Sequence, residues 1–194
     1  GTPVNDAPTA TNLSAAETYV EDTALNLTDI VVSDIDSATV TATLTLSNIA
    51  AGSLNTATSG AVTSTYNAGT GVWSASGAIA DVNALLAGLT FTPAANFNSN
   101  FTIATSVSDG VAAAITGSKA MTGTPVNDAP TATNLSAAET YVEDTALNLV
   151  DIVITDVDSA NVTATLTLSN IAAGSLNTAT SGAVTSTYNA GTGV

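Results

Sequence analysis

The chain has 194 residues, with no cysteine and no histidine, and its sixteen acidic residues outnumber a single basic one, for a net charge of −15. This composition excludes disulfides and the common zinc, copper and haem sites, and it makes nucleic acid and anionic membrane surfaces poor partners. The longest apolar runs, such as Val111–Ile115, are too short to span a bilayer, so we expect no membrane insertion.

A long internal repeat organises the sequence. Gly1–Leu27 recurs letter for letter as Gly123–Leu149, and residues 123–194 match residues 1–72 except at five pairs of positions. Those pairs are Thr28/Val150, Val32/Ile154, Ser33/Thr155, Ile35/Val157 and Thr39/Asn161. A period of this length suits a whole domain repeated in tandem.

The repeat divides the chain into four parts: a linker (1–7), a complete domain (8–125), a second linker (126–130) and a truncated copy (131–194). We interpret the chain as a piece of a longer array. The truncated copy lacks counterparts of Trp73 and the segments after it, which would leave an apolar face open. We expect it to be completed, either by continuation of the same polypeptide or by strands from a neighbouring chain.

Taken in chain order, the first segments read as strands. Ala24–Val32 is the first, and Val40–Ser47 alternates strictly between apolar and hydroxyl side chains, as a half-buried antiparallel strand does. Ala61–Ser76 supplies further strands, with a turn at Asn67–Gly71.

The later segments add a helix and a hairpin. Asp81 is a natural N-cap and Gly88 a natural stop for one short helix between them. Phe101–Ser108 alternates again, and Asp109–Gly110 then predicts a hairpin with a two-residue type I′ turn. About seven short strands separated by turns describe an all-β, immunoglobulin-like sandwich, with Trp73, Phe91 and Phe101 in its core.

Five segments in order carry a resemblance over the whole period: VNDAPTA, EDTAL, SDIDS, LTFTPAANFN and VSDG. Together they resemble the cadherin-like, immunoglobulin-like (VCBS-type) repeats of giant bacterial RTX-type adhesins. The resemblance implies tandem β-sandwiches, calcium at the linkers, export by type I secretion and an extracellular place on the bacterial cell surface.

The acidic residues can also be interpreted without the family. Most lie in two equivalent segments, residues 6–36 and 128–158. If successive strands run up and down, their loops alternate between the two ends of the sandwich, and seven side chains should converge where one domain meets the next. They are Glu21, Asp22, Asp81, Asn127, Asp128, Asp156 and Asp158.

So many carboxylates without a nearby base would repel one another, and a bound divalent cation removes that repulsion. Oxygen ligands in flexible loops favour calcium over magnesium. The same reasoning predicts an incomplete half-site at the other end of the first copy. Its members are Asn5, Asp6, Asp34, Asp36 and Asp109.

Simpler interpretations stay open for individual residues. Asp81 is a helix cap that could also be a ligand, and Asp109 is more often a turn residue. Glu17 and Asp29 are expected to be solvated surface charges. Trp73 is expected in the core rather than on a sugar-binding surface.

The leading hypothesis is a calcium-stiffened extender repeat of a secreted bacterial surface adhesin, whose partners are the neighbouring repeats of its own chain. The alternative is a subunit of an extracellular fibre or surface layer, in which identical chains contact each other. A carbohydrate-binding module would need an exposed aromatic cluster, and aromatic residues make up only 4% of the chain. We do not expect an enzyme, because no histidine or cysteine is available and Lys119 is the only base.

Overall fold

The computed structural model describes residues 4–194 and divides the chain into two compact units, Gly1–Asn127 and Asp128–Val194. The described chain is all-β in character, with several sheets and one α-helix, α1 (Ile79–Ala87). The longer strands of the first unit are β2 (Glu17–Val20), β5 (Thr39–Leu46), β10 (Val72–Ala78), β11 (Thr90–Pro93), β12 (Phe101–Ser108) and β13 (Ile115–Thr124). Its shorter strands are β1 (Thr9–Ala10), β3 (Leu25–Asn26), β4 (Val32–Ser33), β6 (Gly52–Leu54), β7 (Thr58–Ser59), β8 (Val62–Thr63) and β9 (Thr65–Asn67).

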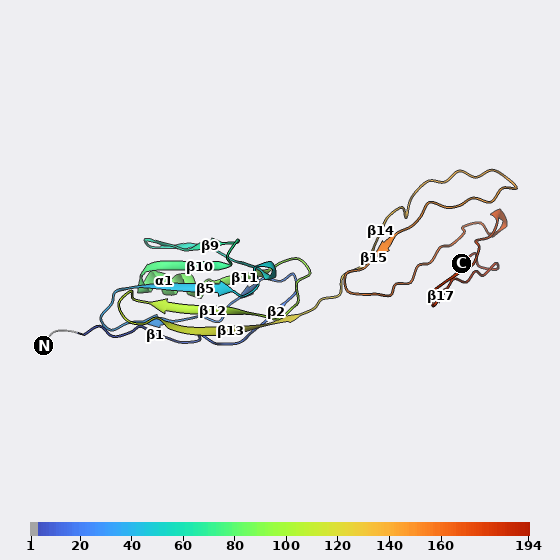
Figure 1. The fold of residues 1–194 in the computed structure, drawn as a ribbon. Coiled ribbons are helices and arrows are strands. Elements are labelled where there is room, and N and C mark those ends of the chain that lie inside the picture. Colours follow the sequence, from blue (N-terminus) through green and yellow to red (C-terminus); the bar gives the residue numbers. More distant parts are fainter. Residues whose placement is uncertain (1–3) are drawn as a thin grey trace. The chain divides into compact units, whose positions relative to one another are not determined.

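The main sheet of the first unit has six strands in the order β2-β13-β12-β5-β10-β9 (Figure 1). All its pairs are antiparallel except β2 and β13, which run parallel, with Glu17 opposite Met121 and Val20 opposite Thr124. The chain therefore enters the unit at one end of this sheet and leaves it at the other. A second sheet, β3-β11-β6, pairs early and late segments of the unit.

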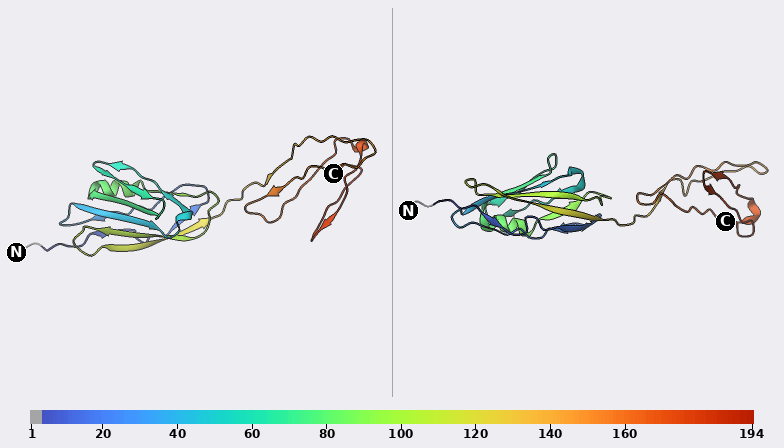
Figure 2. Two further views of the ribbon diagram at one scale, coloured as in Figure 1. Left: turned by 45° about the horizontal axis from the view of Figure 1, so that its top comes forward. Right: turned by 60° about the horizontal axis from the view of Figure 1, so that its bottom comes forward.

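The core lies between the six-stranded sheet and a layer made by the three-stranded sheet and α1 (Figure 2). Strict alternation in β5 puts Val40, Ala42, Leu44 and Leu46 into this core, as the sequence predicted. β12 alternates in the same way, and its bounds are those predicted. Trp73, Phe91 and Phe101 are buried, which confirms their core assignment.

Tyr19 joins Phe91, Phe97 and Phe101 in an aromatic cluster, with ring centroids 5.1–6.4 Å apart. Trp73 donates its indole N–H to Asn55 O at 3.0 Å, so its polar atom is satisfied inside the unit. The aromatic residues of the first unit thus stabilise its interior.

Two local predictions were wrong. The helix begins at Ile79, so Asp81 is not its cap but lies in its first turn, where the helix dipole favours an acid. The β12–β13 connection spans residues 109–114 instead of forming a two-residue turn. Asp109 shapes it by accepting hydrogen bonds from the N–H groups of Val111 and Ala112, both at 2.9 Å.

The segment predicted as one strand over Ala24–Val32 contains only β3 and the first residue of β4. A side chain satisfies the free backbone edge of Val32, the first residue of β4. Asn83 of α1 accepts a hydrogen bond from Val32 N at 2.8 Å and donates one to Val32 O at 2.9 Å. A helix side chain therefore replaces a neighbouring strand at this point.

A buried ion pair ties β13 to β2. Lys119 is 1% exposed, and its Nζ lies 2.9 Å from Glu17 Oε1. Glu17 also accepts hydrogen bonds from Thr28 N at 2.8 Å and from Thr28 Oγ1 at 3.1 Å, and Lys119 donates to Thr28 O at 3.2 Å. The expectation that Glu17 is a solvated surface charge was wrong, because Glu17 is buried and paired with Lys119, the only base of the chain; Asp29 is exposed as expected.

The second unit has much less regular structure. Its strands are the short pairs β14 (Thr131–Ala132) with β15 (Ile154–Thr155), and β16 (Thr180–Ser181) with β17 (Val184–Thr185). They correspond to β1, β4, β7 and β8 of the first unit. Among residues 4–194, no helix has both the length and the apolar character needed to cross a bilayer.

The first prediction concerns the ion pair. Lys119→Met leaves the Glu17 carboxylate buried without its counter-charge, and this should lower the free energy of unfolding of the first unit by about 3–5 kcal/mol. Urea unfolding followed by the fluorescence of Trp73, the only tryptophan, measures the change. The double variant Glu17→Gln/Lys119→Met should recover much of the loss. A single variant as stable as the parent protein would contradict a stabilising role for the pair.

Candidate functional site

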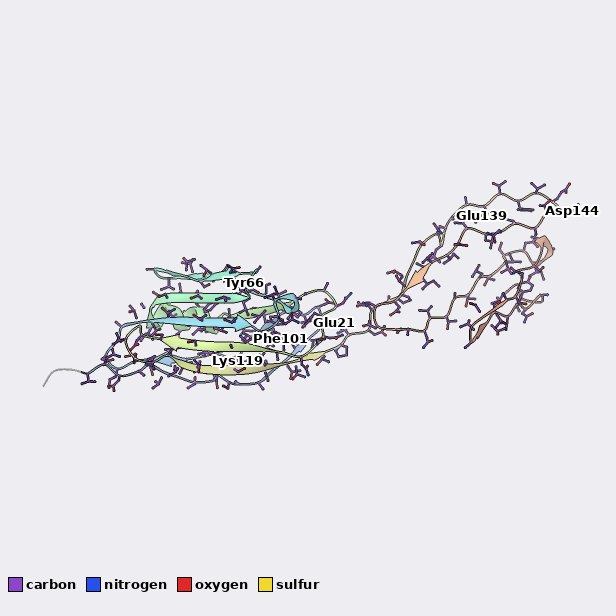
Figure 3. All side chains as sticks on the ribbon, in the orientation of Figure 1. Glu21, Tyr66, Phe101, Lys119, Glu139 and Asp144 are labelled. Atoms are coloured by element: carbon purple, nitrogen blue, oxygen red, sulfur yellow. The ribbon has the colours of Figure 1, made fainter. Side chains whose placement is uncertain are left out.

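Glu21 directly follows β2, at the end of the sheet where β13 also ends (Figure 3). It is 1% exposed. Its Oε2 accepts hydrogen bonds from Asn98 Nδ2 at 3.2 Å and from Val126 N at 2.9 Å. Its Oε1 is buried and has no hydrogen-bond partner among the described residues. One of the two oxygens of this buried carboxylate therefore has no partner that offsets its lost hydration. For an ionised group, this costs folding free energy.

Asp22 places a second carboxylate beside Glu21. It adopts the left-handed conformation (φ 56°), and its Oδ1 accepts a hydrogen bond from Asn96 N at 3.0 Å. A carboxylate oxygen of Asp22 lies within 4.8 Å of one of Glu21. Two like charges at this distance repel each other. A cation bound between them would attract both carboxylates and outweigh this repulsion.

The loop that follows β11 holds this end of the unit together. Asn100 accepts a hydrogen bond from Gly123 N at 3.1 Å, and a Cβ at Gly123 would clash with the backbone of Asn98. Only glycine permits this close approach of the last strand to the Asn98 segment. Burial raises the pKa of Tyr19, and the negative charge of Glu21 raises it further. The Tyr19 hydroxyl donates a hydrogen bond to Ser99 O at 2.7 Å.

The residues of the predicted half-site come together from three segments at the opposite end of the first unit. Asn5 Nδ2 donates to Asp109 Oδ2 at 2.7 Å, which joins the N-terminal segment to the loop after β12. Asp6 N donates to Asp36 Oδ2 at 2.9 Å, which joins the same segment to the loop between β4 and β5. All five predicted members of the half-site take part in these contacts or in those of Asp34.

Asp34 lies at the centre of this second group. Its Oδ1 accepts hydrogen bonds from Ser37 N at 2.8 Å and from Asp36 N at 3.0 Å, whereas its Oδ2 is buried without a partner among the described residues. These backbone donors, Ser37 first, hold the pKa of Asp34 below its ordinary value of 3.8, against burial and the charge of Asp109. The Asn5 amide, followed by the Val111 N–H, likewise lowers the pKa of Asp109. Both groups therefore remain carboxylates at neutral pH.

The second unit repeats the loop geometry of this group. Asp128 N donates to Asp158 Oδ2 at 2.6 Å, as Asp6 N does to Asp36. Asp156 Oδ1 accepts from Asp158 N at 2.9 Å and from Ser159 N at 2.7 Å. The Asp-x-Asp loop is thus formed by local contacts in both copies. The convergence of Asn127, Asp128, Asp156 and Asp158 with Glu21 and Asp22 stays a prediction.

The expected placement of Asp81 beside Glu21 was wrong. β10 runs antiparallel to β5 and ends at Ala78, opposite Thr39, so Asp81 follows at the end of the sheet remote from Glu21. There it accepts a hydrogen bond from Ser59 Oγ at 3.2 Å. Counting loops failed because the short strands β6 and β7, between β5 and the predicted segment Ala61–Ser76, were not included in the simple alternation.

The sequence interpretation missed the amides that hold the acidic groups. Asn96, Asn98 and Asn100 all act at the Glu21 end, through backbone or side-chain atoms. The signal was present as the asparagines that alternate over residues 96–100, within and just after the LTFTPAANFN segment.

Comparison with known proteins does not assign the chain to a family. No family model matches the chain, and no curated protein matches its sequence.

The lowered pKa values of Asp34 and Asp109 predict a specific acid sensitivity. A folded pKa below the ordinary 3.8 contributes stability that is present above about pH 3.8 and is lost as the pH falls through the folded value. The free energy of unfolding of the first unit should therefore fall with pH in this acid range. Asp109→Asn should make that fall shallower in urea titrations between pH 2 and pH 5, while identical slopes for the two proteins would contradict the assignment.

Proposed function

We propose that this chain is a calcium-stiffened extender segment of a secreted bacterial cell-surface adhesin, built from cadherin-like, immunoglobulin-like repeats. The observation that carries the proposal is the buried Glu21 carboxylate, whose Oε1 has no hydrogen-bond partner among the described residues. It lies where the chain leaves the first unit. The only base in the chain, Lys119, is already engaged with Glu17, so the compensating charge must come from solution.

The donor atoms fit a hard cation. In the first unit, Glu21 and Asp22 would hold it at one end, and Asp34, Asp36 and Asp109 at the other. All of these donors are carboxylate oxygens on loops, and such sites suit the larger and less regular coordination shell of calcium. Calcium would supply positive charge where the protein supplies none. Extracellular calcium modules of this kind bind at about 10⁻⁴–10⁻³ M, which matches concentrations outside the cell.

The shape of the first unit supports a spacer role. The chain enters at one end of the six-stranded sheet and leaves at the other, so each added unit adds length. The acidic groups lie at these two ends, where successive units of a tandem array are linked. A sugar-binding surface is not favoured, because Trp73 and the cluster of Tyr19 are internal. The proposal assigns no catalytic step to the chain.

If calcium binds at Glu21, the effect of Glu21→Gln on stability should change sign between calcium-free and calcium-containing solution. Without calcium, the amide removes an uncompensated buried charge and can face Asp22, so the variant should be at least as stable as the parent protein. With calcium at ten times its Kd, the parent protein should gain about 1.4 kcal/mol through linkage, and the variant should not. Thermal unfolding followed by Trp73 fluorescence, in chelator and in calcium, measures both effects.

Asp29→Asn is the matched control for this experiment, because it removes an exposed carboxylate outside both acidic groups. It should keep the calcium response of the parent protein. An equal calcium response from the Glu21→Gln variant would remove Glu21 from the site. A parent protein that calcium does not stabilise at all would overturn the calcium assignment.

Stiffening predicts a change in dimensions. Small-angle scattering from the whole chain should give a shorter mean maximum dimension in chelator than in calcium, because the linker then samples bent arrangements. Asp128→Ala should behave like partial chelation. Unchanged scattering on chelation, from a protein that binds calcium in the unfolding assay, would reject the stiffening role while leaving calcium binding intact.

A further inference from the structure

Glu21 ties the last residues of the first unit to its sheet. Its backbone N donates to Thr124 O at 3.0 Å, and its side-chain Oε2 accepts from Val126 N at 2.9 Å. One residue therefore holds residues 124–126, here called the exit segment, at two points. The backbone contact continues the parallel pairing of β2 with β13, whereas the contact of the carboxylate lies beyond that pairing.

The same carboxylate oxygen also holds the loop between β11 and β12, residues 94–100, here called the asparagine loop. Glu21 Oε2 accepts a second hydrogen bond, from Asn98 Nδ2 at 3.2 Å. Beside it, Asp22 Oδ1 accepts from Asn96 N at 3.0 Å. Two adjacent carboxylates thus fasten both the exit segment and the asparagine loop to the end of β2.

These contacts have an electrostatic cost, because they require the Glu21 side chain to be buried. Both donors to Oε2 are uncharged, and Oε1 has no partner among the described residues. The Asp22 carboxylate, within 4.8 Å, adds repulsion. Rotation of the Glu21 side chain into water would relieve both costs, since water stabilises the ionised form. That rotation would break the bonds to Val126 and Asn98 and leave the backbone pairing of β2 with β13 in place.

A cation changes which of these two arrangements has the lower free energy. Bound at Glu21 Oε1 and at Asp22, it offsets the cost of burial, and it can do so only while the Glu21 side chain points inward. Cation binding and the two hydrogen bonds of Oε2 must then favour each other by thermodynamic linkage. A glutamine at this position would remove the same cost without a cation, because it buries no charge.

We propose that Glu21 is a charge-controlled latch. The latch is closed when a cation neutralises the buried side chain, which then holds the exit segment and the asparagine loop. Without a cation the side chain turns into water and the latch opens. Asn98 is a positioning residue of the latch, because its amide holds Oε2 and so leaves Oε1 to face the ion. The latch takes its ion from the proposed function, and it supplies the contact through which that ion controls the exit segment.

Amide hydrogen exchange, measured residue by residue by NMR on the whole chain, tests the latch. At calcium ten times its Kd, the Val126 amide should exchange about tenfold more slowly than in chelator, because calcium binds the closed state only. The reference is the Gly69 amide, which donates to Asn67 Oδ1 at 2.9 Å in an exposed turn and should keep its exchange rate. An unchanged Val126 rate in a protein that calcium stabilises would overturn the latch.

Two variants of Glu21 should fix the latch in opposite states. Glu21→Gln keeps an acceptor for Val126 N and buries no charge. Its Val126 amide should exchange as slowly in chelator as that of the parent protein does in calcium, with no further response to calcium. Glu21→Ala has no acceptor, so the amide should exchange fast in both solutions. If Gln and Ala both speed exchange relative to the parent protein in chelator, Glu21 is a structural residue and the latch is rejected.

Asn98→Ala and Asn100→Ala form the matched pair for the positioning residue. Each removes one side-chain hydrogen bond of the asparagine loop, but Asn98 contacts Glu21, whereas Asn100 accepts from Gly123 N at 3.1 Å. The calcium Kd, taken from a titration of the Val126 amide signal, should rise about tenfold in Asn98→Ala. It should stay within about twofold of the parent value in Asn100→Ala. Equal Kd values for the two variants would remove Asn98 from the latch.

The latch and the calcium site fail in different ways. If calcium raises the unfolding temperature and leaves the Val126 exchange rate unchanged, the ion binds without a latch, and the proposed function stands alone. If calcium has no effect on stability, but Glu21→Gln slows Val126 exchange in chelator, the latch responds to charge and the calcium site is rejected. Equal Val126 exchange in the parent protein, Glu21→Gln and Glu21→Ala would overturn the latch whatever calcium does.

Discussion

The core of the first unit forms only because strands from residues 72–124 pair with strands from residues 17–54. β5 acquires both its neighbours, β10 and β12, from that later stretch, and Phe91 of β11 helps to close the core. The second unit contains nearly the same sequence up to the counterpart of Val72, and its core positions are exposed. Alternation in the sequence therefore selects which side chains face inward, but only non-local strand pairing buries them.

The charge distribution of the first unit follows from one buried ion pair. The single base of the chain is used within the core, where Lys119 pairs with Glu17. The carboxylates of Asp34, Asp109 and Glu21, at the two ends of the first unit, are held by backbone N–H groups and asparagine amides. These donors orient the carboxylates without neutralising them, so an acidic end remains a place where cations from solution gather.

Sequence reasoning succeeded where a feature is local. The alternation of β5 and β12 and the Asp-x-Asp loops at Asp34 and Asp156 depend on neighbouring residues, and the loops form alike in both units. It failed where the outcome depends on strand order. The end at which Asp81 lies is set by reversals between β5 and β10, and the burial of Glu17 is set by Lys119, which is 102 residues away. Composition alone made Glu17 look like an ordinary surface charge.

The parallel pairing of β2 with β13 has a mechanical consequence. Along the chain, β2 is the first strand of the six-stranded sheet and β13 is the last, and they lie side by side in the same direction. A pulling force between the two ends drags β2 backward and β13 forward along their common axis. The hydrogen bonds across this parallel pair are evenly spaced along both strands, so the force shears them together instead of opening them one at a time. The buried Lys119–Glu17 contact bridges the same pair of strands and shares the load.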